Sequence, residues 1–446
     1  MRSLAQVLLD LGWRLTGSDT AAGADGLFAD AGVRVFDSHA AEHLPPGTDV
    51  AIASDAVAPD NPEVCRAIEL GIATYSYFEA LGRLMADKQG IAIAGTHGKS
   101  TASAMLAHVL RLADEDPTVV FGATPLGQSS GGGAGSGSRM LVEACEYRAN
   151  FLHLRPRQAV ILGIEPDHFD CYPNVGALHD AFARFARSVP SDGLLLVRHD
   201  CQASRRIARG LDRRVRTFGF DPGANWSVGR GASLRGRWRF ELVHDGRRLA
   251  KVALQTPGWH NVLNALAAAA LAGEIGIPPE TIAAGLGEFR GLHRRLEVVG
   301  AWRGVTLIDD YAHHPTEITA TLATVRRMYP GRQIWCVFQP HQVSRTKRLL
   351  DELAGSLQNA DRVVVADIFR AREPEWLPDE VTAADLAAKV RRGRVQVADV
   401  HATAEIVRLL QDQLEPGDVL ITMGAGDIRK IGDGIFDGIR KDRAAI

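Results

Sequence analysis

A glycine-rich stretch between an apolar run and an alanine-rich segment constrains the fold of this 446-residue chain more than any other feature. Residues 91–94 have the length of a buried strand, GTHGKST follows at 95–101, and the next residues favour a helix. Glycine lets backbone N–H groups approach an anion, and a helix N-terminus adds partial positive charge. We therefore predict that the loop binds phosphate, with Lys99 on the β- and γ-phosphates and the hydroxyl of Ser100 or Thr101 on Mg²⁺.

The loop differs from the ordinary Walker pattern because Ile93 stands where the first glycine is expected. The alternative interpretation is an ordinary glycine-rich turn between a strand and a helix. The predicted phosphate-binding residues are Gly95, Thr96, His97, Gly98, Lys99, Ser100 and Thr101.

The length of the chain predicts about three domains. The formal net charge is -2 and no long basic run occurs, so the composition does not favour binding to nucleic acid or to a membrane surface. The apolar residues 263–277 are too few and too interrupted to span a bilayer, and no signal peptide is visible. The five cysteines lack metal-type spacing and indicate reduced thiols, so we expect a cytoplasmic protein.

Residues 1–86 alternate between strand and helix patterns of the Rossmann type. A strand is expected to end at residues 14–19 and another to occupy residues 49–54, and an acidic residue after a second strand often binds a ribose. The usual Gly-x-Gly-x-x-Gly turn is absent, because the sequence begins inside the first helix. By itself this region is a weak nucleotide-binding signal.

Acidic residues and a histidine follow two apolar strands beyond the loop. Glu146 stands in EACEY at 143–147, and Asp167 and His168 stand in IEPDHFDCY at 164–172. The carboxyl ends of parallel strands are where α/β sheets place a nucleotide and its metal. Glu146 and His168 are therefore candidate Mg²⁺ ligands. Taken alone, the residues also permit solvated loop acids and a histidine that caps a helix.

The glycine run at 127–137 has a composition typical of a flexible loop, and we assign it no chemistry. Residues 226–255 predict a short β-ribbon with a hairpin at Asp245-Gly246. Their aromatic and basic residues also permit nucleic-acid binding, but we prefer the ribbon. His260, Asn261 and Asn264 open an alanine-rich helix, where they either cap the helix or face a ligand.

From residue 305 onward, strands alternate with helical patterns, which predicts a mostly parallel, doubly wound sheet. Polar clusters end three strands, at DDYAHHP (309–315), FQPHQVSR (338–345) and GAGD (424–427). Three histidines and an arginine on two neighbouring strand ends indicate a functional site.

The motifs GTHGKST, EACEY, IEPDHFDCY, DDYAHHPTEI and FQPHQVSRT resemble those of the Mur ligases, the ATP-dependent amide-forming enzymes of peptidoglycan precursor synthesis. The resemblance covers nearly the whole chain in order. It implies an α/β protein of three domains: a Rossmann-like domain for a uridine-nucleotide substrate at 1–86, a central ATP-binding domain at 87–292, and a Rossmann-like domain for an amino acid at 293–446.

The resemblance also implies individual roles. Lys99, His168, His313 and His341 are the expected catalytic residues, and Ser100, Glu146 and His168 the expected Mg²⁺ ligands. Besides the loop, ATP is expected to contact His260, Asn264, Arg295 and Asp309. The amino acid is expected to contact Tyr311, His313, His341 and Arg345, and the uridine nucleotide Ser18, Asp19 and Ser54.

Within the family, the motifs are most similar to the branch that joins L-alanine to the carboxylate of UDP-N-acetylmuramate through an acyl phosphate. A branch that adds a tripeptide shares these motifs, and a catalytically weak nucleotide-binding relative is a further alternative. Folylpolyglutamate synthase shares the loop but lacks the DDYAHHP and FQPH pair. We expect small-molecule substrates and a monomer or dimer.

Three departures from the family pattern stand out. Cys145 replaces an acidic residue, and Gln342 replaces the arginine usual in the alanine-adding branch, so one charge near the incoming carboxylate is missing. The third is the absent opening strand. From it we expect either a missing upstream segment or a weakened uridine site on a loosely held first domain.

Overall fold

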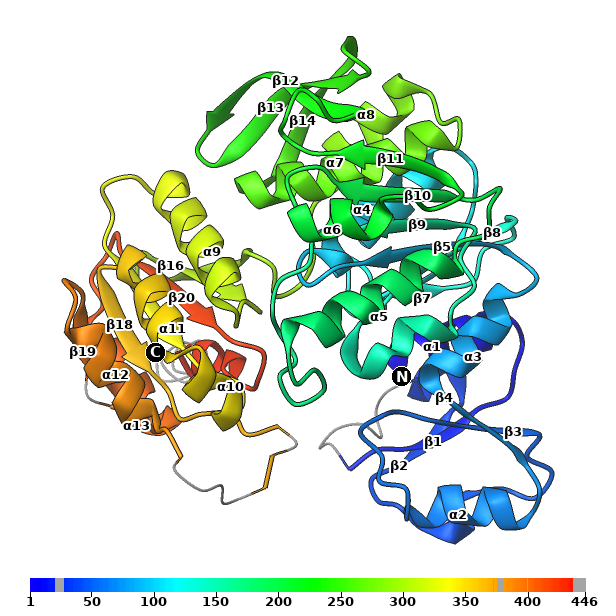
Figure 1. Ribbon diagram of the computed structural model, residues 1–446. Helices are drawn as coiled ribbons and strands as arrows, with labels where there is room; N and C mark the ends of the chain where they lie inside the picture. Colours follow the sequence, from blue (N-terminus) through cyan, green and yellow to red (C-terminus); the bar gives the residue numbers. More distant parts are fainter. Residues whose placement is uncertain (21–27, 372, 375–379, 399, 436–446) are drawn as a thin grey trace.

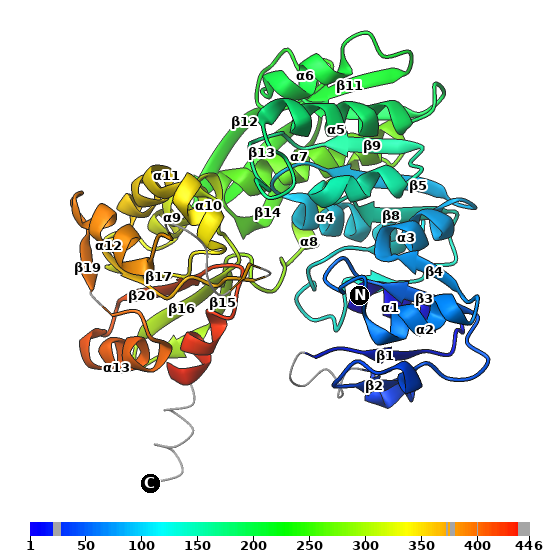
Figure 2. The same cartoon turned by 60° about the horizontal axis from the view of Figure 1, so that its bottom comes forward.

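The computed structural model describes residues 1–20, 28–371, 373–374, 380–398 and 400–435. Figure 1 shows an N-terminal part in blue, a central part in cyan and green, and a C-terminal part in yellow to red. Figure 2, turned by 60°, shows the N-terminal and C-terminal parts each beside the central one. We found no helix among the described residues that is long and apolar enough to cross a membrane.

The N-terminal part contains four short strands that form two separate parallel pairs. β1 (Thr16–Ser18) pairs with β2 (Arg34–Phe36), and β3 (Val50–Ala53) pairs with β4 (Ala73–Ser76). The helices are α1 (Arg2–Asp10), η2 (Ala29–Ala31), η3 (Ala41–His43), α2 (Pro62–Glu69) and α3 (Tyr77–Met85). The alternation of strands and helices agrees with the sequence, although the described strands do not join into one sheet.

Helix α1 packs on the glycine run that the sequence predicts to be a flexible loop. Ser3 donates a hydrogen bond to the carbonyl oxygen of Phe121 at 2.7 Å, and the backbone N–H of Ala134 donates to Asp10 at 2.9 Å. A Cβ atom on Gly132 would lie 1.9 Å from the carbonyl oxygen of Ser3. The flexible-loop interpretation is wrong here, because part of the run forms β7 (Gly132–Gly133) and its glycines allow the helix to approach.

The central part is built on a ten-stranded sheet of order β14-β13-β12-β11-β10-β9-β5-β8-β6-β7. Strands β6, β8, β5, β9, β10 and β11 run parallel, and β12 to β14 form the predicted antiparallel ribbon. The strands are β5 (Gln89–Ala94), β6 (Thr118–Val120), β8 (Arg139–Glu143), β9 (Gln158–Ile161), β10 (Leu194–Arg198), β11 (Arg214–Phe218), β12 (Trp226–Leu234), β13 (Arg237–His244) and β14 (Arg247–Pro257). The helices are α4 (Lys99–Leu112), η4 (Tyr147–His153), α5 (Val175–Ser188), α6 (Gln202–Ala208), α7 (Trp259–Glu274) and α8 (Pro279–Glu288).

Strand β5 is buried on both faces, because successive side chains of a strand point to opposite sides. Ile91 and Ile93 lie in an apolar cluster with α4, α7 and α8. Ala92 and Ala94 lie in a second cluster with α1, α3 and α5. The strand therefore fixes the loop that follows it from both sides of the sheet.

The C-terminal part is a six-stranded sheet of order β15-β16-β20-β17-β18-β19, in which only the edge pair β15–β16 is antiparallel among the described strands. The strands are β15 (Glu297–Trp302), β16 (Val305–Asp310), β17 (Ile334–Phe338), β18 (Arg362–Val365), β19 (Gln396–Ala398) and β20 (Val419–Met423). The helices are α9 (Pro315–Met328), α10 (Val343–Arg348), α11 (Leu350–Ser356), η5 (Leu357–Asn359), α12 (Ala383–Arg391) and α13 (Thr403–Gln413). The doubly wound prediction is confirmed, since α9, α11 and α12 cover one face and α13 the other.

Candidate active site

The loop at 95–101, called the phosphate loop below, connects β5 to α4 as the sequence predicts. Gly98 has the left-handed φ of 81°, and a Cβ atom there would lie 2.3 Å from the side-chain oxygen of Asn264. Glycine at this position therefore serves two purposes, the backbone turn and the close approach of α7. Asn264 is thus brought against the phosphate loop.

The side chain of Lys99 folds back over the loop. Its Nζ atom donates to the carbonyl oxygens of Gly95 at 2.6 Å and Thr96 at 3.1 Å, and lies 2.9 Å from Oε2 of Glu146. Burial alone would lower the pKa of this amine, but the Glu146 carboxylate more than offsets it and raises the pKa. Lys99 is therefore a fixed cation at the start of α4.

Glu146 and His168 face each other across two strand ends, with Nε2 of His168 3.2 Å from Oε1 of Glu146. Glu146 is only 1% exposed, so it is not a solvated loop acid. Burial would raise the pKa of its carboxyl, but Lys99 and His168 hold the pKa below the ordinary value. The structure thus brings together the candidate metal ligands from the EACEY and IEPDHFDCY motifs.

Glu143 is a residue of this site that sequence reasoning missed. The hydroxyl of Ser100 donates to its carboxylate at 2.9 Å, and the backbone N–H of Gly122 donates to it at 2.7 Å. Its place at the end of β8, three residues before Glu146, was the available signal. Ser100, Glu146 and His168 offer a hydroxyl, a carboxylate and an imidazole beside the phosphate loop. This donor set fits Mg²⁺ that is also bound by phosphate oxygens.

His97 joins the phosphate loop to the C-terminal part. Its Nδ1 atom lies 3.1 Å from Oε1 of Glu317 on α9, and its Nε2 atom lies 3.4 Å from Oε2 of Glu165. Burial opposes the charge on the ring, but the two carboxylates raise the pKa of His97 to about 9. The hydrogen bond from His97 is the largest cause that lowers the pKa of Glu165, to about 2.

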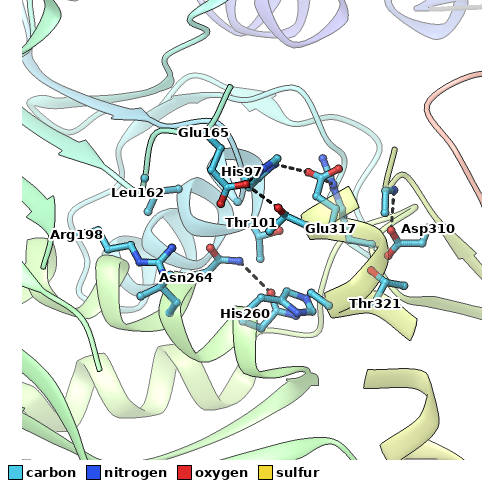
Figure 3. Close-up of a pocket in the computed structure, with 18 residues that line it drawn as sticks. His97, Thr101, Leu162, Glu165, Arg198, His260, Asn264, Asp310, Glu317 and Thr321 are labelled. Carbon is cyan, nitrogen blue, oxygen red and sulfur yellow. Dashed lines mark hydrogen bonds and ion pairs between the residues drawn. The ribbon is translucent and has the colours of Figure 1, made fainter. Parts of the chain in front are cut away.

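A cavity of about 150 Å³, called the interface pocket below, lies between the central and C-terminal parts (Figure 3). Burial lowers the pKa of His260 to about 4, so the imidazole in its wall is neutral at pH 7. The pocket includes six of the predicted ATP-binding residues: His97, Gly98, Thr101, His260, Asn264 and Arg295.

The wall of the interface pocket differs from the predicted set of ATP-binding residues at three positions: Arg198, Asp310 and Asp309. Arg198 at the end of β10 and Asp310 at the end of β16 line the pocket, although the sequence did not single them out. The predicted ribose ligand Asp309 lies outside it. Its carboxylate accepts a hydrogen bond from Thr422 at 2.9 Å and lies 3.5 Å from Nε of Arg294.

A larger cavity of about 720 Å³, called the central cleft below, is lined by all three parts of the chain. Asp55, Ala56 and Phe78 come from the N-terminal part. The central part contributes Lys99, Ser100 and His168. The C-terminal part contributes Tyr311, His313, His341, Gln342 and Arg345. The cleft therefore connects the phosphate loop to the predicted amino-acid residues.

Arg345 binds Asp167 across the cleft, with Nη2 2.5 Å from Oδ2, and both side chains are buried. Burial would raise the pKa of Asp167, but the arginine lowers it to about 2. Burial, and then the Arg345 charge, lower the pKa of His313 to about 3, so its ring is neutral at pH 7. The rings of His313 and His341 lie 5.7 Å apart, which places two imidazoles at this end of the cleft.

Tyr311 lies beside the two arginines of the junction between the central and C-terminal parts. The guanidinium groups of Arg294 and Arg295 lie 4.8 Å and 5.1 Å from the centre of its ring. Such cation–π contacts hold the ring in place. Arg295 borders both the interface pocket and the central cleft.

Gln342 has a φ of 68°, which is rare for a residue other than glycine. Its backbone N–H donates to the carbonyl oxygen of Phe369 at 2.8 Å. The next N–H group, of Val343, donates to Glu373 at 2.5 Å. These bonds hold the start of α10 in an unusual conformation at the wall of the cleft, which is typical of functional sites.

The predicted uridine-site residues lie away from the wall of the central cleft. The Ser18 hydroxyl donates to Glu63 at 2.6 Å, and the Ser54 hydroxyl accepts from the N–H of Ala56 at 3.3 Å. Asp19 donates its backbone N–H to Phe36 at 2.9 Å. None of the three borders the cleft among the described residues, whereas Asp55, next to Ser54, does.

Comparison with known proteins explains why these parts meet in one cleft. Three family models match the chain in order: the Mur ligase family catalytic domain at 1–89, the Mur ligase middle domain at 93–272, and the glutamate ligase domain of Mur ligases at 294–426. The UDP-N-acetylmuramate–L-alanine ligase of Clostridium novyi is 37% identical over 435 residues, which are 97% of this chain and 94% of that protein. The chain belongs to the Mur ligase family.

Solved structures of the Mur ligase family agree with this assignment. A UDP-N-acetylmuramate–alanine ligase from Thermotoga maritima is similar with a TM-score of 0.82 and 25% identity, over 99% of this chain and 96% of that one. A murein peptide ligase from Psychrobacter arcticus is similar with a TM-score of 0.73 and 25% identity, over 98% of this chain and 95% of that one. The three-part α/β architecture implied by the sequence motifs is confirmed.

Proposed function

We propose that this Mur ligase joins L-alanine to the carboxylate of UDP-N-acetylmuramate with ATP, in peptidoglycan precursor synthesis. The observation that carries the proposal is the central cleft, in which the phosphate loop faces His313, His341 and Arg345. The names of similar proteins from Clostridium novyi and Thermotoga maritima support this choice of substrates. We assign the three domains to residues 1–86, 87–292 and 293–446, and a cytoplasmic location, where ATP is available.

In the first step, a carboxylate oxygen attacks the γ-phosphorus of ATP, and ADP leaves. Both reactants are negatively charged, so a cation must lie between them. Lys99 is that cation, since its ammonium group is fixed at the start of α4 and borders the central cleft. The base and ribose of ATP fit the interface pocket, where neutral His260 and the amide of Asn264 offer hydrogen-bonding groups.

We further propose that Ser100, Glu146 and His168 hold Mg²⁺. When bound, this ion would neutralise negative charge on the phosphate oxygens. Glu143 keeps the Ser100 hydroxyl directed away from α4 and toward the strand ends. Glu146, which is buried and paired with Lys99, would then also balance part of the charge of the ion.

In the second step, the amine nitrogen attacks the acyl phosphate, loses a proton and expels inorganic phosphate as the amide forms. We propose His313 and His341 as the groups that receive the proton, because their rings lie together at this end of the central cleft. Arg345 and Tyr311 would position the amino acid. Arg345 is already held by Asp167, so it is oriented before the substrate arrives.

Contacts between the central and C-terminal parts would protect the acyl phosphate from water. Thr316 donates to Glu165 at 2.7 Å, and His97 binds Glu317 at 3.1 Å. Together with the Asp167–Arg345 pair, these contacts join the central part to the C-terminal part. We propose that Ser18, Asp19 and Ser54 of the N-terminal part bind the uridine nucleotide.

One assay tests the substrates. Purified protein is given ATP, Mg²⁺ and UDP-N-acetylmuramate, and phosphate release is compared among single amino acids and the tripeptide L-alanyl-γ-D-glutamyl-meso-diaminopimelate. The proposal expects release with L-alanine. Release only with the tripeptide would assign the chain to the second candidate, a murein peptide ligase, which the similar structure from Psychrobacter arcticus supports. If none of the amines tested causes phosphate release, both candidate functions are contradicted.

A further inference from the structure

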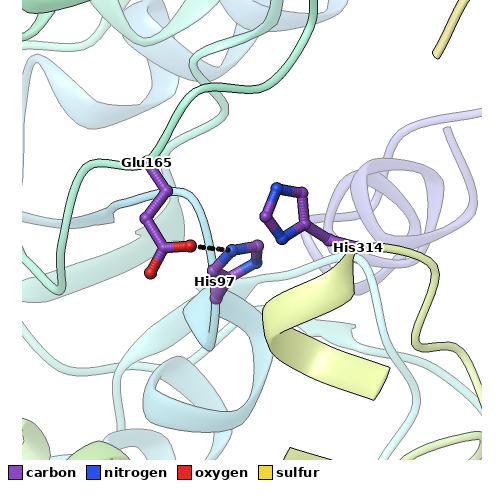
Figure 4. Close-up of side chains that lie close together, drawn as sticks. All are labelled: His97, Glu165 and His314. Atoms are coloured by element: carbon purple, nitrogen blue, oxygen red, sulfur yellow. Dashed lines mark ion pairs between the residues drawn. The ribbon is translucent and has the colours of Figure 1, made fainter. Parts of the chain in front are cut away.

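Two imidazoles and a carboxylate meet where the phosphate loop touches the first turn of α9 (Figure 4). His97 belongs to the loop, Glu165 follows β9, and His314 precedes α9. One nitrogen or oxygen atom of each lies within 4.8 Å of the other two. This group is distinct from Ser100, Glu146 and His168, which are proposed above to hold Mg²⁺.

The donor types and their spacing suit a transition-metal ion. Zn²⁺ takes histidine nitrogens and carboxylate oxygens at about 2.0–2.2 Å, usually with four ligands, so neighbouring ligand atoms lie about 3.3–3.5 Å apart. Nε2 of His97 and Oε2 of Glu165 are 3.4 Å apart. The ligand atoms of His97, Glu165 and His314 all lie within 4.8 Å of one another, so movements of at most about 1.5 Å bring them to this spacing. Nε2 of His97 is buried and already faces the carboxylate of Glu165 as an ion pair.

Neighbouring residues already orient His97 and Glu165, as the outer partners of metal ligands do. Glu317 binds Nδ1 of His97 at 3.1 Å, which directs Nε2 toward Glu165. The hydroxyl of Thr316 donates to Glu165 at 2.7 Å. Nδ1 of His314 accepts from the N–H of Thr316 at 3.3 Å, so this nitrogen has the lone pair of the neutral ring, and a bound ion would replace this hydrogen bond.

We propose that His97, Glu165 and His314 bind one transition-metal ion of the Zn²⁺ class, with water in the fourth position. The ion displaces any proton on Nε2 of His97, because a metal and a proton compete for the same lone pair. His97 and Glu165 belong to the central part and His314 to the C-terminal part. A bound ion therefore ties the two parts together. If the central cleft must open for product release, the ion slows turnover. This consequence for turnover rests on the proposed function, whereas binding of the ion does not.

The test measures metal binding directly. Full-length, metal-free protein is mixed with excess Mg²⁺ to fill the proposed Mg²⁺ site, and is then titrated with Co²⁺, whose visible absorption reports tetrahedral coordination. We expect one equivalent of Co²⁺ to give the band and Zn²⁺ to abolish it. Absence of any band, together with no Zn²⁺ binding by calorimetry, overturns the proposal.

Matched variants locate the site. Glu165→Gln keeps the size of the side chain and its contact with Thr316 but removes the charged ligand, so it should weaken binding at least 10-fold. His168→Gln should leave binding unchanged. Glu288→Gln is the control. Glu288 pairs with His108 at 3.9 Å, and neither residue belongs to the His97, Glu165 and His314 group, so this variant should bind Co²⁺ like the parent protein.

The other results with these variants also test whether His97, Glu165 and His314 bind the ion. Unchanged binding in Glu165→Gln overturns the proposal, and so does loss of binding in His168→Gln. His314→Gln should behave like Glu165→Gln. If that variant unfolds on heating well below the parent protein, the result with Glu165→Gln decides alone.

Discussion

The ammonium group of Lys99 lies 2.9 Å from a carboxylate oxygen of Glu146, and the two residues are 47 positions apart in the sequence. The cation proposed for the γ-phosphate is thus paired with a residue proposed for the metal. Lys99 also bonds to two carbonyl oxygens of its own loop. If both bind as proposed, the nucleotide and the metal would redistribute these contacts, and ATP binding would depend on Mg²⁺.

Replacing Lys99 should remove charge stabilisation in the transition state. For Lys99→Ala we expect kcat/KM for ATP to fall roughly 100-fold, about 3 kcal/mol, as for loss of one group directed at developing charge. Steady-state phosphate release measures this. Lys251→Ala, which removes an exposed lysine of β14, is the control and should match the parent protein. Near-parental turnover of Lys99→Ala would remove this residue from the mechanism.

Glu146 and His168 should bind metal. Glu146→Gln and His168→Gln are each expected to raise the Mg²⁺ concentration needed for half-maximal rate, because each removes one ligand. A Mg²⁺ titration of the ligation rate checks this, with circular dichroism to show that the fold persists. Glu405→Gln, at an exposed residue of α13, is the control. An unchanged titration in both variants would make the pair structural.

Gln342 should weaken recognition of the amino acid, because an arginine binds a carboxylate through two parallel bonds and glutamine cannot. Gln342→Arg is expected to lower KM for L-alanine. Gln342→Gly is the matched control: it relieves the positive φ of 68° without adding charge, so it should not lower KM. If Gln342→Arg and Arg345→Ala both leave KM unchanged, the amino acid binds elsewhere.

The strand ends of the site could be predicted because each motif and its strand are neighbours in the sequence. GTHGKST, EACEY and DDYAHHP each follow an apolar run, and the structure confirms a strand that leads into each motif. The pairs between distant segments could not be predicted in this way. His97 and Glu317 are 220 residues apart, and Asp167 and Arg345 are 178 apart. Such pairs depend on how two sheets dock, and periodicity within one segment has no information on docking.

The same reason explains the error at the glycine run. Its composition is that of a linker, but residue 132 must be glycine for another reason: α1 lies so close that a Cβ atom there would clash with the backbone of Ser3. Residue composition alone does not distinguish glycines that make the backbone flexible from glycines that let another segment approach closely. Asp309 and Asp310 show a related limit. Adjacent residues of a strand point to opposite faces, so only the structure showed that Asp310 borders the interface pocket.

The contact between α1 and β7 gives a prediction about stability. For Gly132→Ala we expect a loss of about 1–3 kcal/mol, because the added methyl group meets the backbone of Ser3. Thermal unfolding and limited proteolysis near α1 check this. Gly355→Ala in α11 is the control, since a Cβ atom there meets nothing within 4 Å. Equal melting temperatures and cleavage rates would show that α1 does not need the close approach.

The acyl-phosphate route through the central cleft is tested most directly by isotope transfer. UDP-N-acetylmuramate labelled with ¹⁸O in both carboxylate oxygens is incubated with the protein, ATP, Mg²⁺ and L-alanine, and the inorganic phosphate is analysed by mass spectrometry. The attacking oxygen stays with phosphorus when the amide forms, so each phosphate should contain one ¹⁸O and each product amide should keep the other. Unlabelled phosphate released along with amide product would contradict the account, because the carboxylate would then never have been phosphorylated.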